Sequence, residues 1–134
     1  MINYKEFDSS LLFEIKAIYD DSGWSAYLQD NEKLKSAFDN SLYLFGAFDH
    51  DNLVAFIRCV GDGEHIILIQ DLIVLSTYQK KGIGTYLLKH CWDKYQDVRL
   101  FTLLTDIHNE TSNHFYQSMN MKKLEQANCV CYYR

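Results

Sequence analysis

The sequence predicts a single mixed α/β domain over residues 1–134, in which a central mixed sheet carries helices on both faces. Two observations predict it. Short apolar runs rich in β-branched residues alternate with segments of helical apolar periodicity between residues 65 and 119. Hairpin signals flank this alternation, which favours a mixed sheet over an all-parallel one. With 134 residues, 48% of them hydrophobic, the chain can bury a core of its own.

The first forty residues predict one strand and two helices. Residues 1–8 are assigned to the strand. Ser9 or Ser10 is placed to cap a helix that ends at the turn sequence Asp20-Asp-Ser-Gly23. Its apolar face consists of Leu11, Leu12, Ile15, Ile18 and Tyr19. A second helix is expected over residues 31–39.

The middle of the chain predicts a hairpin and a long strand. Apolar runs at 42–49 and 53–60 are joined by His50-Asp-Asn, and Asp-Asn between apolar runs is a hairpin signal. After a turn at Gly61-Asp-Gly63, residues 65–74 form the long central strand.

The last third predicts two helices, a strand and a terminal hairpin. We expect helices over residues 82–96 and 110–119, with a strand over 98–104 between them. The hairpin pairs residues 121–125 with 129–133. The complete order is βααβββαβαββ.

The composition excludes several partners. The net charge is −5 and no run of Lys or Arg exceeds two residues, so no nucleic-acid partner is expected. No apolar run approaches membrane-spanning length, and the first residues lack the apolar core of a signal peptide, which predicts a cytoplasmic protein without a membrane partner. The four cysteines are then expected to stay reduced, and their spacing predicts no metal site; they are Cys59, Cys91, Cys129 and Cys131.

Residues 71–89 organise the chain, because a buried strand leads through a glycine-bearing turn into a helix. Gly82 and Gly84 lack Cβ atoms at the helix start, where the first N–H groups have no partner within the helix. Such a helix start binds phosphate readily. The P-loop string is absent, and Leu87 stands where a dinucleotide fingerprint needs a small residue.

Two motifs carry a resemblance to a known family. Gln79-Lys-Lys-Gly82-Ile-Gly84 matches the pattern Gln/Arg-x-x-Gly-x-Gly/Ala, and Asn109 is followed six and seven residues later by Phe115 and Tyr116. With both motifs in place, residues 40–134 resemble the GNAT superfamily of acetyl-CoA-dependent N-acetyltransferases. The resemblance implies that the fourth and fifth strands splay apart and admit the pantetheine arm of acetyl-CoA.

The resemblance also implies a set of acetyl-CoA contacts. The fourth strand would bond the pantetheine amides through its backbone, and the following loop and first helical turn would hold the pyrophosphate. The implied residues are Ile73, Val74, Gln79, Lys80, Lys81, Gly82, Ile83, Gly84, Thr85 and Asn109. Three alternatives stay open: ordinary ladder pairing of the strand, a solvated turn, and Asn109 as the N-cap of the next helix.

Tyr116 and Asp71 are the expected catalytic residues. A departing CoA thiolate needs a proton, which a positioned phenol can donate. Tyr116 stands where related enzymes carry this acid; the alternative is a core aromatic. Asp71 is a carboxylate among apolar strand residues, which is costly unless it has a partner. It is expected to act as base or ammonium ligand, or to pair structurally, while Glu64, His65 and an ordered water are the alternative bases.

An amine is the expected acceptor. The resemblance implies a nitrogen nucleophile, and the excess of 18 acidic over 13 basic residues favours a cation. Trp24 and Tyr27 are expected to hold the acceptor, because aromatic faces attract cationic amines. Glu64 is expected beside them.

The sequence therefore predicts an N-acetyltransferase that moves an acetyl group from acetyl-CoA to a primary amine, small or lysine-like, by direct transfer in a ternary complex. The alternative is a non-catalytic acyl-CoA-binding module, because fold alone does not decide function. A homodimer is expected through the terminal hairpin, which carries the apolar residues Val130, Tyr132 and Tyr133.

Overall fold

A five-stranded sheet with the strand order β1-β2-β3-β4-β5 forms the centre of the fold. The computed structural model describes residues 1–134. The strands are β1 (Ile2–Glu6), β2 (Tyr43–Asp49), β3 (Asn52–Gly61), β4 (Ile66–Val74) and β5 (Leu100–Leu103). The strands β1 to β4 pair with one another in antiparallel fashion, and β5 is parallel to β4. The predicted mixed α/β fold is therefore confirmed.

The chain divides into two compact units, Met1–Leu103 and Leu104–Arg134, and each is described by itself. The first unit holds the sheet, three helices and three short 3₁₀ helices. The second holds α4 (Glu110–Ser118) and the 3₁₀ helix η4 (Leu124–Ala127). A single domain over residues 1–134 stays a prediction.

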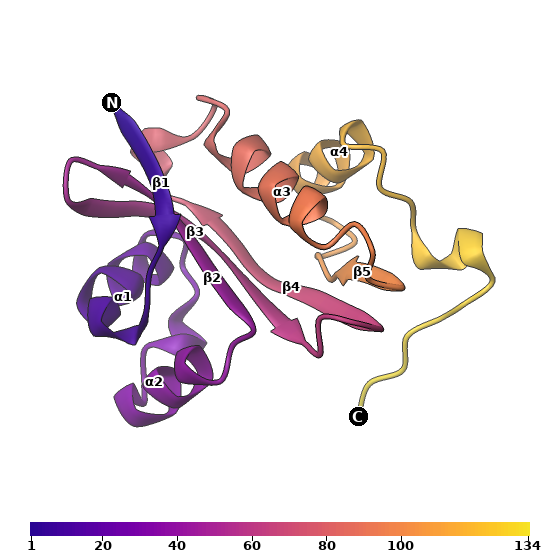
Figure 1. The fold of residues 1–134 in the computed structure, drawn as a ribbon, viewed down its shortest axis with the longest axis horizontal. Helices are drawn as coiled ribbons and strands as arrows, with labels where there is room; N and C mark the ends of the chain where they lie inside the picture. Colours follow the sequence, from indigo (N-terminus) through magenta and orange to yellow (C-terminus); the bar gives the residue numbers. More distant parts are fainter. The chain divides into compact units, whose positions relative to one another are not determined.

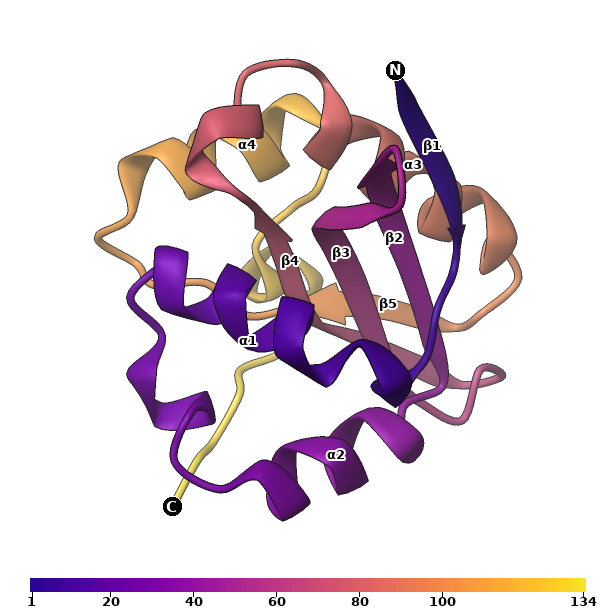
Figure 2. The same ribbon diagram turned by 90° about the vertical axis from the view of Figure 1, so that its left-hand side faces the viewer.

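Helices cover both faces of the sheet in the first unit (Figures 1 and 2). The helices α1 (Leu12–Asp21) and α2 (Asn31–Asp39) lie on one face, and α3 (Ile83–Lys94) lies on the other. The 3₁₀ helices are η1 (Ser9–Leu11), η2 (Ser25–Tyr27) and η3 (Ser76–Tyr78). No helix is long and apolar enough to span a bilayer.

Apolar packing holds α1 and α2 against the sheet. The predicted face of α1 is buried at Ile15, Ile18 and Tyr19, which recur at helical spacing. The buried core on this side joins them to Leu34, Phe38, Leu44, Phe48, Leu53, Phe56 and Ile73. Burial of such apolar surface contributes about 25 cal/mol per Å² to folding.

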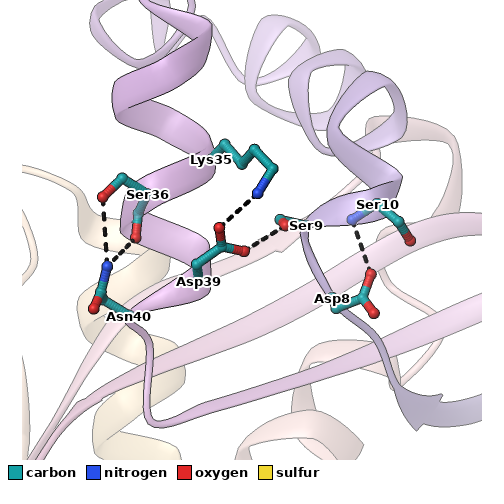
Figure 3. Close-up of polar contacts among 7 residues, drawn as sticks. All are labelled: Asp8, Ser9, Ser10, Lys35, Ser36, Asp39 and Asn40. Carbon is teal, nitrogen blue, oxygen red and sulfur yellow. Dashed lines mark hydrogen bonds and ion pairs between the residues drawn. The ribbon is translucent and has the colours of Figure 1, made fainter.

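A polar junction joins the start of α1 to the end of α2 (Figure 3). The Asp39 carboxylate accepts a hydrogen bond from the Ser9 hydroxyl and pairs with Lys35 Nζ at 2.7 Å. Asp8 caps the first turn by accepting from the Ser10 N–H at 2.8 Å. Asp8 caps η1, whereas α1 begins after Leu11 without a side-chain cap, so the cap predicted at Ser9 or Ser10 is wrong.

A β-bulge in β4 changes the face of the sheet to which the side chains of its second half point. Arg58 pairs with Asp71 while the next residue, Cys59, pairs with Ile69, which leaves Gln70 as the extra residue. Since adjacent residues of β3 point to opposite faces, Asp71 and Ile69 do so as well. Asp71 therefore faces α1 and α2, whereas Ile69 and Cys59 face α3.

The bulge lies where β4 parts from β5. Pairing between these strands covers only the first four residues of β4 and stops at Ile69, opposite Leu103. The second half of β4 pairs with β3 alone. One edge of this half is therefore without a strand partner, as the predicted splaying requires.

The predicted terminal hairpin is wrong. Residues 121–125 and 129–133 form no strands, and the chain makes η4 between them. Gln126 Oε1 accepts from the Lys123 N–H at 3.1 Å, and Asn128 closes the turn with φ 60°. Local hydrogen bonds of this kind favour a helical turn, because an isolated two-stranded hairpin is marginal without further sheet to pair with.

Candidate functional site

The loop between β4 and α3 presents an open helix start. Lys80 and Gly82 are left-handed, with φ 63° and 82°, and Gly82 is the N-cap residue of α3. A Cβ atom built on Gly82 would meet no atom within 4 Å, so its surroundings are open to a ligand. The first intrahelical bond of α3 runs from Tyr86 N to Gly82 O at 3.0 Å. The preceding amides therefore stand free at the positive end of the helix dipole.

Two carboxylates from other elements anchor this loop. Asp21, at the end of α1, accepts from Ser76 N at 2.8 Å and from Ser76 Oγ at 3.0 Å. Asp49, at the end of β2, accepts from the Tyr78 hydroxyl at 2.6 Å. This bond lowers the pKa of Asp49 and raises that of Tyr78. The helix start is thus held in one position by both faces of the fold.

The predicted loop residues divide into two sets. Gln79 donates through Nε2 to Val74 O at 3.1 Å, so its side chain fastens the loop to the strand. Lys80, Lys81 and Thr85 are exposed, and Lys81 Nζ lies 5.5 Å from the centre of the Tyr78 ring. The lysines and the free amides of Ile83, Gly84 and Thr85 are therefore the groups available to an anion.

The unpaired edge of β4 exposes the backbone of Val74. Leu75 N donates to Val54 O at 2.9 Å, and backbone groups alternate sides along an antiparallel strand. The N–H and C=O of Ile73 therefore point to Phe56 of β3 and take part in the ladder. Those of Val74 point to the side without a strand. Of the two predicted pantetheine contacts, only Val74 has backbone groups outside the β3–β4 ladder: its N–H is free, and its carbonyl already accepts from Gln79 Nε2.

Asp71 lies in a buried network with two residues. Its side chain is 1% exposed, and Oδ2 accepts from Arg58 Nε at 2.6 Å and from the Tyr19 hydroxyl at 2.7 Å. Arg58 is 6% exposed. Burial alone would lower the pKa of Arg58, but the charge and hydrogen bond of Asp71 outweigh it and raise that pKa. Burial, followed by the Asp71 charge, raises the pKa of Tyr19, which stays a donor.

Trp24 and Tyr27 lie beside this network. Tyr27 stacks on Tyr19 with ring centres 4.7 Å apart, and the Trp24 ring lies 6.0 Å from Tyr19. Gln70, the bulge residue, donates weakly to the Tyr27 hydroxyl at 3.4 Å. Trp24 is 39% exposed. The structure therefore brings together Asp71 and the two predicted acceptor residues, with Tyr19 between them.

Glu64 does not join this group. It lies in the turn between β3 and β4, where its N–H donates to the Asp62 carboxylate at 2.9 Å. The nine residues of β4 separate this turn from the loop that opens α3, about 30 Å at 3.3 Å per residue.

Asn109 and Tyr116 lie in the second unit. Asn109 is the N-cap of α4, where its Oδ1 accepts from Ser112 N at 3.0 Å. The side-chain oxygen is therefore committed to the helix, and the exposed amide nitrogen is the group left for a ligand. Tyr116 is half-buried and meets Phe115 edge-on, with ring centres 5.3 Å apart. Burial raises the pKa of Tyr116, so the phenol stays protonated at neutral pH.

Comparison with known proteins identifies the family. A family model described as "Acetyltransferase (GNAT) family" matches residues 9–121. The chain belongs to this family. A GNAT family acetyltransferase of Streptococcus pneumoniae TIGR4 is 32% identical, with a TM-score of 0.82, and the match covers 100% of this chain and 96% of that one.

Other GNAT relatives match in fold or over part of their length. The aminoglycoside N-acetyltransferase AAC(6')-Iy, solved in complex with CoA, has a TM-score of 0.77 at 13% identity over 100% of this chain and 94% of that one. An uncharacterized ycf52-like N-acetyltransferase of Prochlorococcus marinus is 31% identical over 90 residues, 64% of this chain and 49% of that protein. A second, from Gracilaria tenuistipitata var. liui, is matched over 59% of its length. The chain thus spans about half the length of the curated relatives it matches.

Sequence reasoning missed Arg58 and Tyr19. Arg58 stands alone in an otherwise apolar strand, and a buried Arg requires a buried acceptor. A lone Asp in the next strand, Asp71, was the signal that could have found the pair. Tyr19 was assigned to the apolar face of its helix, and nothing in its spacing distinguishes a phenol with a polar partner from a packed ring.

Proposed function

We propose that this GNAT family member is an acetyl-CoA-dependent N-acetyltransferase acting on a primary amine. The observation that carries the proposal is a continuous binding strip in the first unit. The unpaired edge of β4 leads through the anchored loop to the open start of α3. A strand edge suits the amides of pantetheine, and a helix start suits its pyrophosphate.

The residues of this strip fit coenzyme A. Lys80, Lys81 and the amides of the first turn of α3 hold the pyrophosphate, and Gly82 lets it approach the backbone. The Val74 carbonyl accepts a hydrogen bond from a pantetheine amide through its second lone pair, since Gln79 Nε2 occupies the first. The amide nitrogen of Asn109 donates to the same arm. CoA complexes of fold relatives at low identity, such as AAC(6')-Iy, are consistent with this assignment.

Acetyl-CoA supplies a thioester whose acetyl carbon takes the amine nitrogen while the carbon–sulfur bond breaks, so that an amide and the free thiol of CoA result. Val74 N–H polarises the thioester carbonyl. Tyr116 donates its proton to the departing sulfur. Asp71 accepts a hydrogen bond or proton from the attacking nitrogen. Holding both reactants in one complex supplies much of the rate.

The acceptor is a primary amine with an apolar stem. Trp24 and Tyr27 flank the Asp71 network and present aromatic faces, which attract cations and pack against hydrocarbon. Fold relatives include an aminoglycoside acetyltransferase in complex with sisomicin. Small amines and lysine side chains are the acceptors to test first.

A non-catalytic acyl-CoA-binding module is the second candidate. The engagement of Asp71 by Arg58 and Tyr19 favours it, because the carboxylate already has an ionic partner. The two candidates separate in one assay, the release of free thiol from acetyl-CoA across a panel of amines. Thiol release above the hydrolysis rate supports the enzyme; CoA binding without release supports the module.

Gly82→Asp tests the anion site. The new carboxylate would stand where the phosphates approach, so the increase in melting temperature produced by CoA should vanish. At about 100 times Kd this increase corresponds to about 2.7 kcal/mol in the unmodified protein. Gly82→Asn is the matched control, since it has the same shape without the charge. An unchanged shift in Gly82→Asp would reject the loop assignment.

Tyr116→Phe tests the acid. The ring remains and the proton is lost, so kcat should fall by about 10²–10⁴-fold, with the CoA-induced thermal shift kept. A kcat close to the original value, with chemistry rate-limiting, would make Tyr116 a packing residue.

A homodimer is also proposed. Tyr132 and Tyr133 are 91% and 97% exposed, and Val130 beside them is exposed as well, which is unusual for a small protein unless a partner covers them. Light scattering at micromolar concentrations should give twice the chain mass. A monomer mass would reject the dimer.

A further inference from the structure

The two carboxylate oxygens of Asp71 have unequal surroundings. Oδ2 accepts both hydrogen bonds of the network, one from Arg58 Nε and one from the Tyr19 hydroxyl. Oδ1 is buried and has no hydrogen-bond partner. It is the one buried side-chain polar atom of the protein left in this condition.

An unpartnered buried carboxylate oxygen is costly. A buried polar group without a hydrogen bond lowers stability, and a charged group lowers it more. Arg58 does not relieve it, because its other hydrogen bond runs from Nη1 to Ser41 Oγ at 3.4 Å. Such groups in native structures mark a missing ligand, water or functional role.

The Asp71 side chain lies next to the proposed acceptor residues. Tyr19, which holds the other oxygen, stacks directly on Tyr27 and lies 6.0 Å from Trp24. Asp71 itself stands beside the bulge residue Gln70, where β4 loses its β5 partner. The Asp71 carboxylate therefore lies in the part of the fold where the aromatic residues and the unpaired strand edge meet.

We infer that Arg58 and Tyr19 are positioning residues that hold Asp71 by Oδ2, so that Oδ1 accepts an N–H or O–H donor from the acceptor amine or its relay water. This inference rests on the proposed function. Arg58 also balances the charge of Asp71, so the site recognises the amine by a directed hydrogen bond and aromatic contact instead of by net charge.

A double-mutant cycle tests whether Tyr19 acts through Asp71. Tyr19→Phe keeps the ring and its stacking and removes only the hydroxyl. It should lower kcat by up to about 10²-fold, the cost of a misplaced reacting group, with KM for acetyl-CoA nearly unchanged. The same change in the Arg58→Met/Asp71→Leu background should have no further effect on the residual kcat.

That background is chosen because it should fold. Replacing both members of a buried ion pair by apolar residues is often neutral or stabilising, whereas removing one is not. Tyr43→Phe is the matched control. Tyr43 is buried on the α3 face, where its hydroxyl lies 2.9 Å from His90 Nε2, so this variant loses a comparable bond without touching Asp71. Its kcat should be unchanged.

The outcomes separate the inference from the proposed function. The thermal shift produced by tyramine or spermidine with CoA present gives a readout independent of acetyl transfer. If thiol is released but Tyr19→Phe lowers kcat equally in both backgrounds, or in neither, the inference fails and the enzyme stands. If no thiol is released, the inference is kept when the amine raises the melting temperature of the unmodified protein and Arg58→Met/Asp71→Leu abolishes that increase. It is overturned when the amine does not change the melting temperature of the unmodified protein.

Discussion

Arg58 and Cys59 are neighbours in β3 and both are buried, but their side chains lie on opposite faces of the sheet. Arg58 faces α1 and α2 and meets a carboxylate and a phenol. Cys59 faces α3 and meets the Cys91 sulfur at 3.8 Å. That contact and burial raise the pKa of Cys59, so it stays a neutral thiol. One face of the sheet thus buries an ion pair, and the other buries neutral groups, among them the two thiols.

The difference separates packing from chemistry. The α3 face is apolar because its task is to fix the helix whose start forms the proposed anion site; Leu87, Leu88 and Cys91 are fully buried there. The α1 and α2 face retains an ion pair that apolar residues could replace without loss of stability. A buried ion pair is weak evidence for stability, so its presence beside Trp24 and Tyr27 supports the role proposed for Asp71.

The largest loss of stability is expected from a change in the buried ion pair on the α1 and α2 face. Arg58→Met leaves Asp71 buried without its cation and should lower the free energy of unfolding by about 3–5 kcal/mol. Arg58→Met/Asp71→Leu should recover most of this loss. Urea denaturation of the three proteins measures both changes. A single variant no less stable than the double would mean that the pair is not buried together in solution.

The next effect concerns CoA binding at the start of α3, on the other face of the sheet. Because the proposed anion site depends on α3, CoA at about 100 times Kd should add about 2.7 kcal/mol to the free energy of unfolding. The same increment is expected in Arg58→Met/Asp71→Leu, since neither change lies on the α3 face. Thermal unfolding with and without CoA measures it. Loss of the increment in the double variant would show that the two faces are coupled.

A smaller effect is expected from the thiol pair. Cys91→Ala removes one buried atom from the α3 face and should cost about 0.5–1.5 kcal/mol, as for loss of a single buried methylene-sized group. The rate of the proposed acetyl transfer should not change, because the substitution leaves no buried charge without a partner. Equilibrium denaturation and thiol-release assays check the two halves of this expectation. A large fall in kcat at unchanged stability would give the α3 face a chemical role.

The smallest effect is a pH dependence confined to the α3 face. Burial, and then the Lys94 charge, lower the pKa of His90 below 6.5, while its ring stacks on Phe45 at 3.8 Å. The unfolded chain then binds the proton more readily. Stability is fully present above the unfolded pKa and is lost as the pH falls through 6.5 toward the folded pKa. Denaturation at about pH 8 and about pH 5 should show this loss, and His90→Gln should reduce it. An equal loss in the variant would assign the effect elsewhere.

Local patterns in the sequence were sufficient for most elements and for the loop. The helix at 31–39 matches α2 at both ends, and the strand, glycine turn and helix around Gly82 form as predicted. These features depend on side-chain periodicity, caps and left-handed glycines, all of which act within a few residues. The family motifs lie in the same local segments, which is why the GNAT resemblance could be read from the sequence.

Tertiary structure alone decided how the residues of the first unit are brought together. The bulge at Gln70 depends on the register between two strands, and a shift by one residue moves every side chain to the other face. Asp71 meets Arg58 across 13 residues of sequence and Tyr19 across 52, so no local window contains the network. The prediction of a terminal hairpin was wrong for the same reason. A strand forms only where a partner edge is available, and the alternation in residues 129–133 could not supply one.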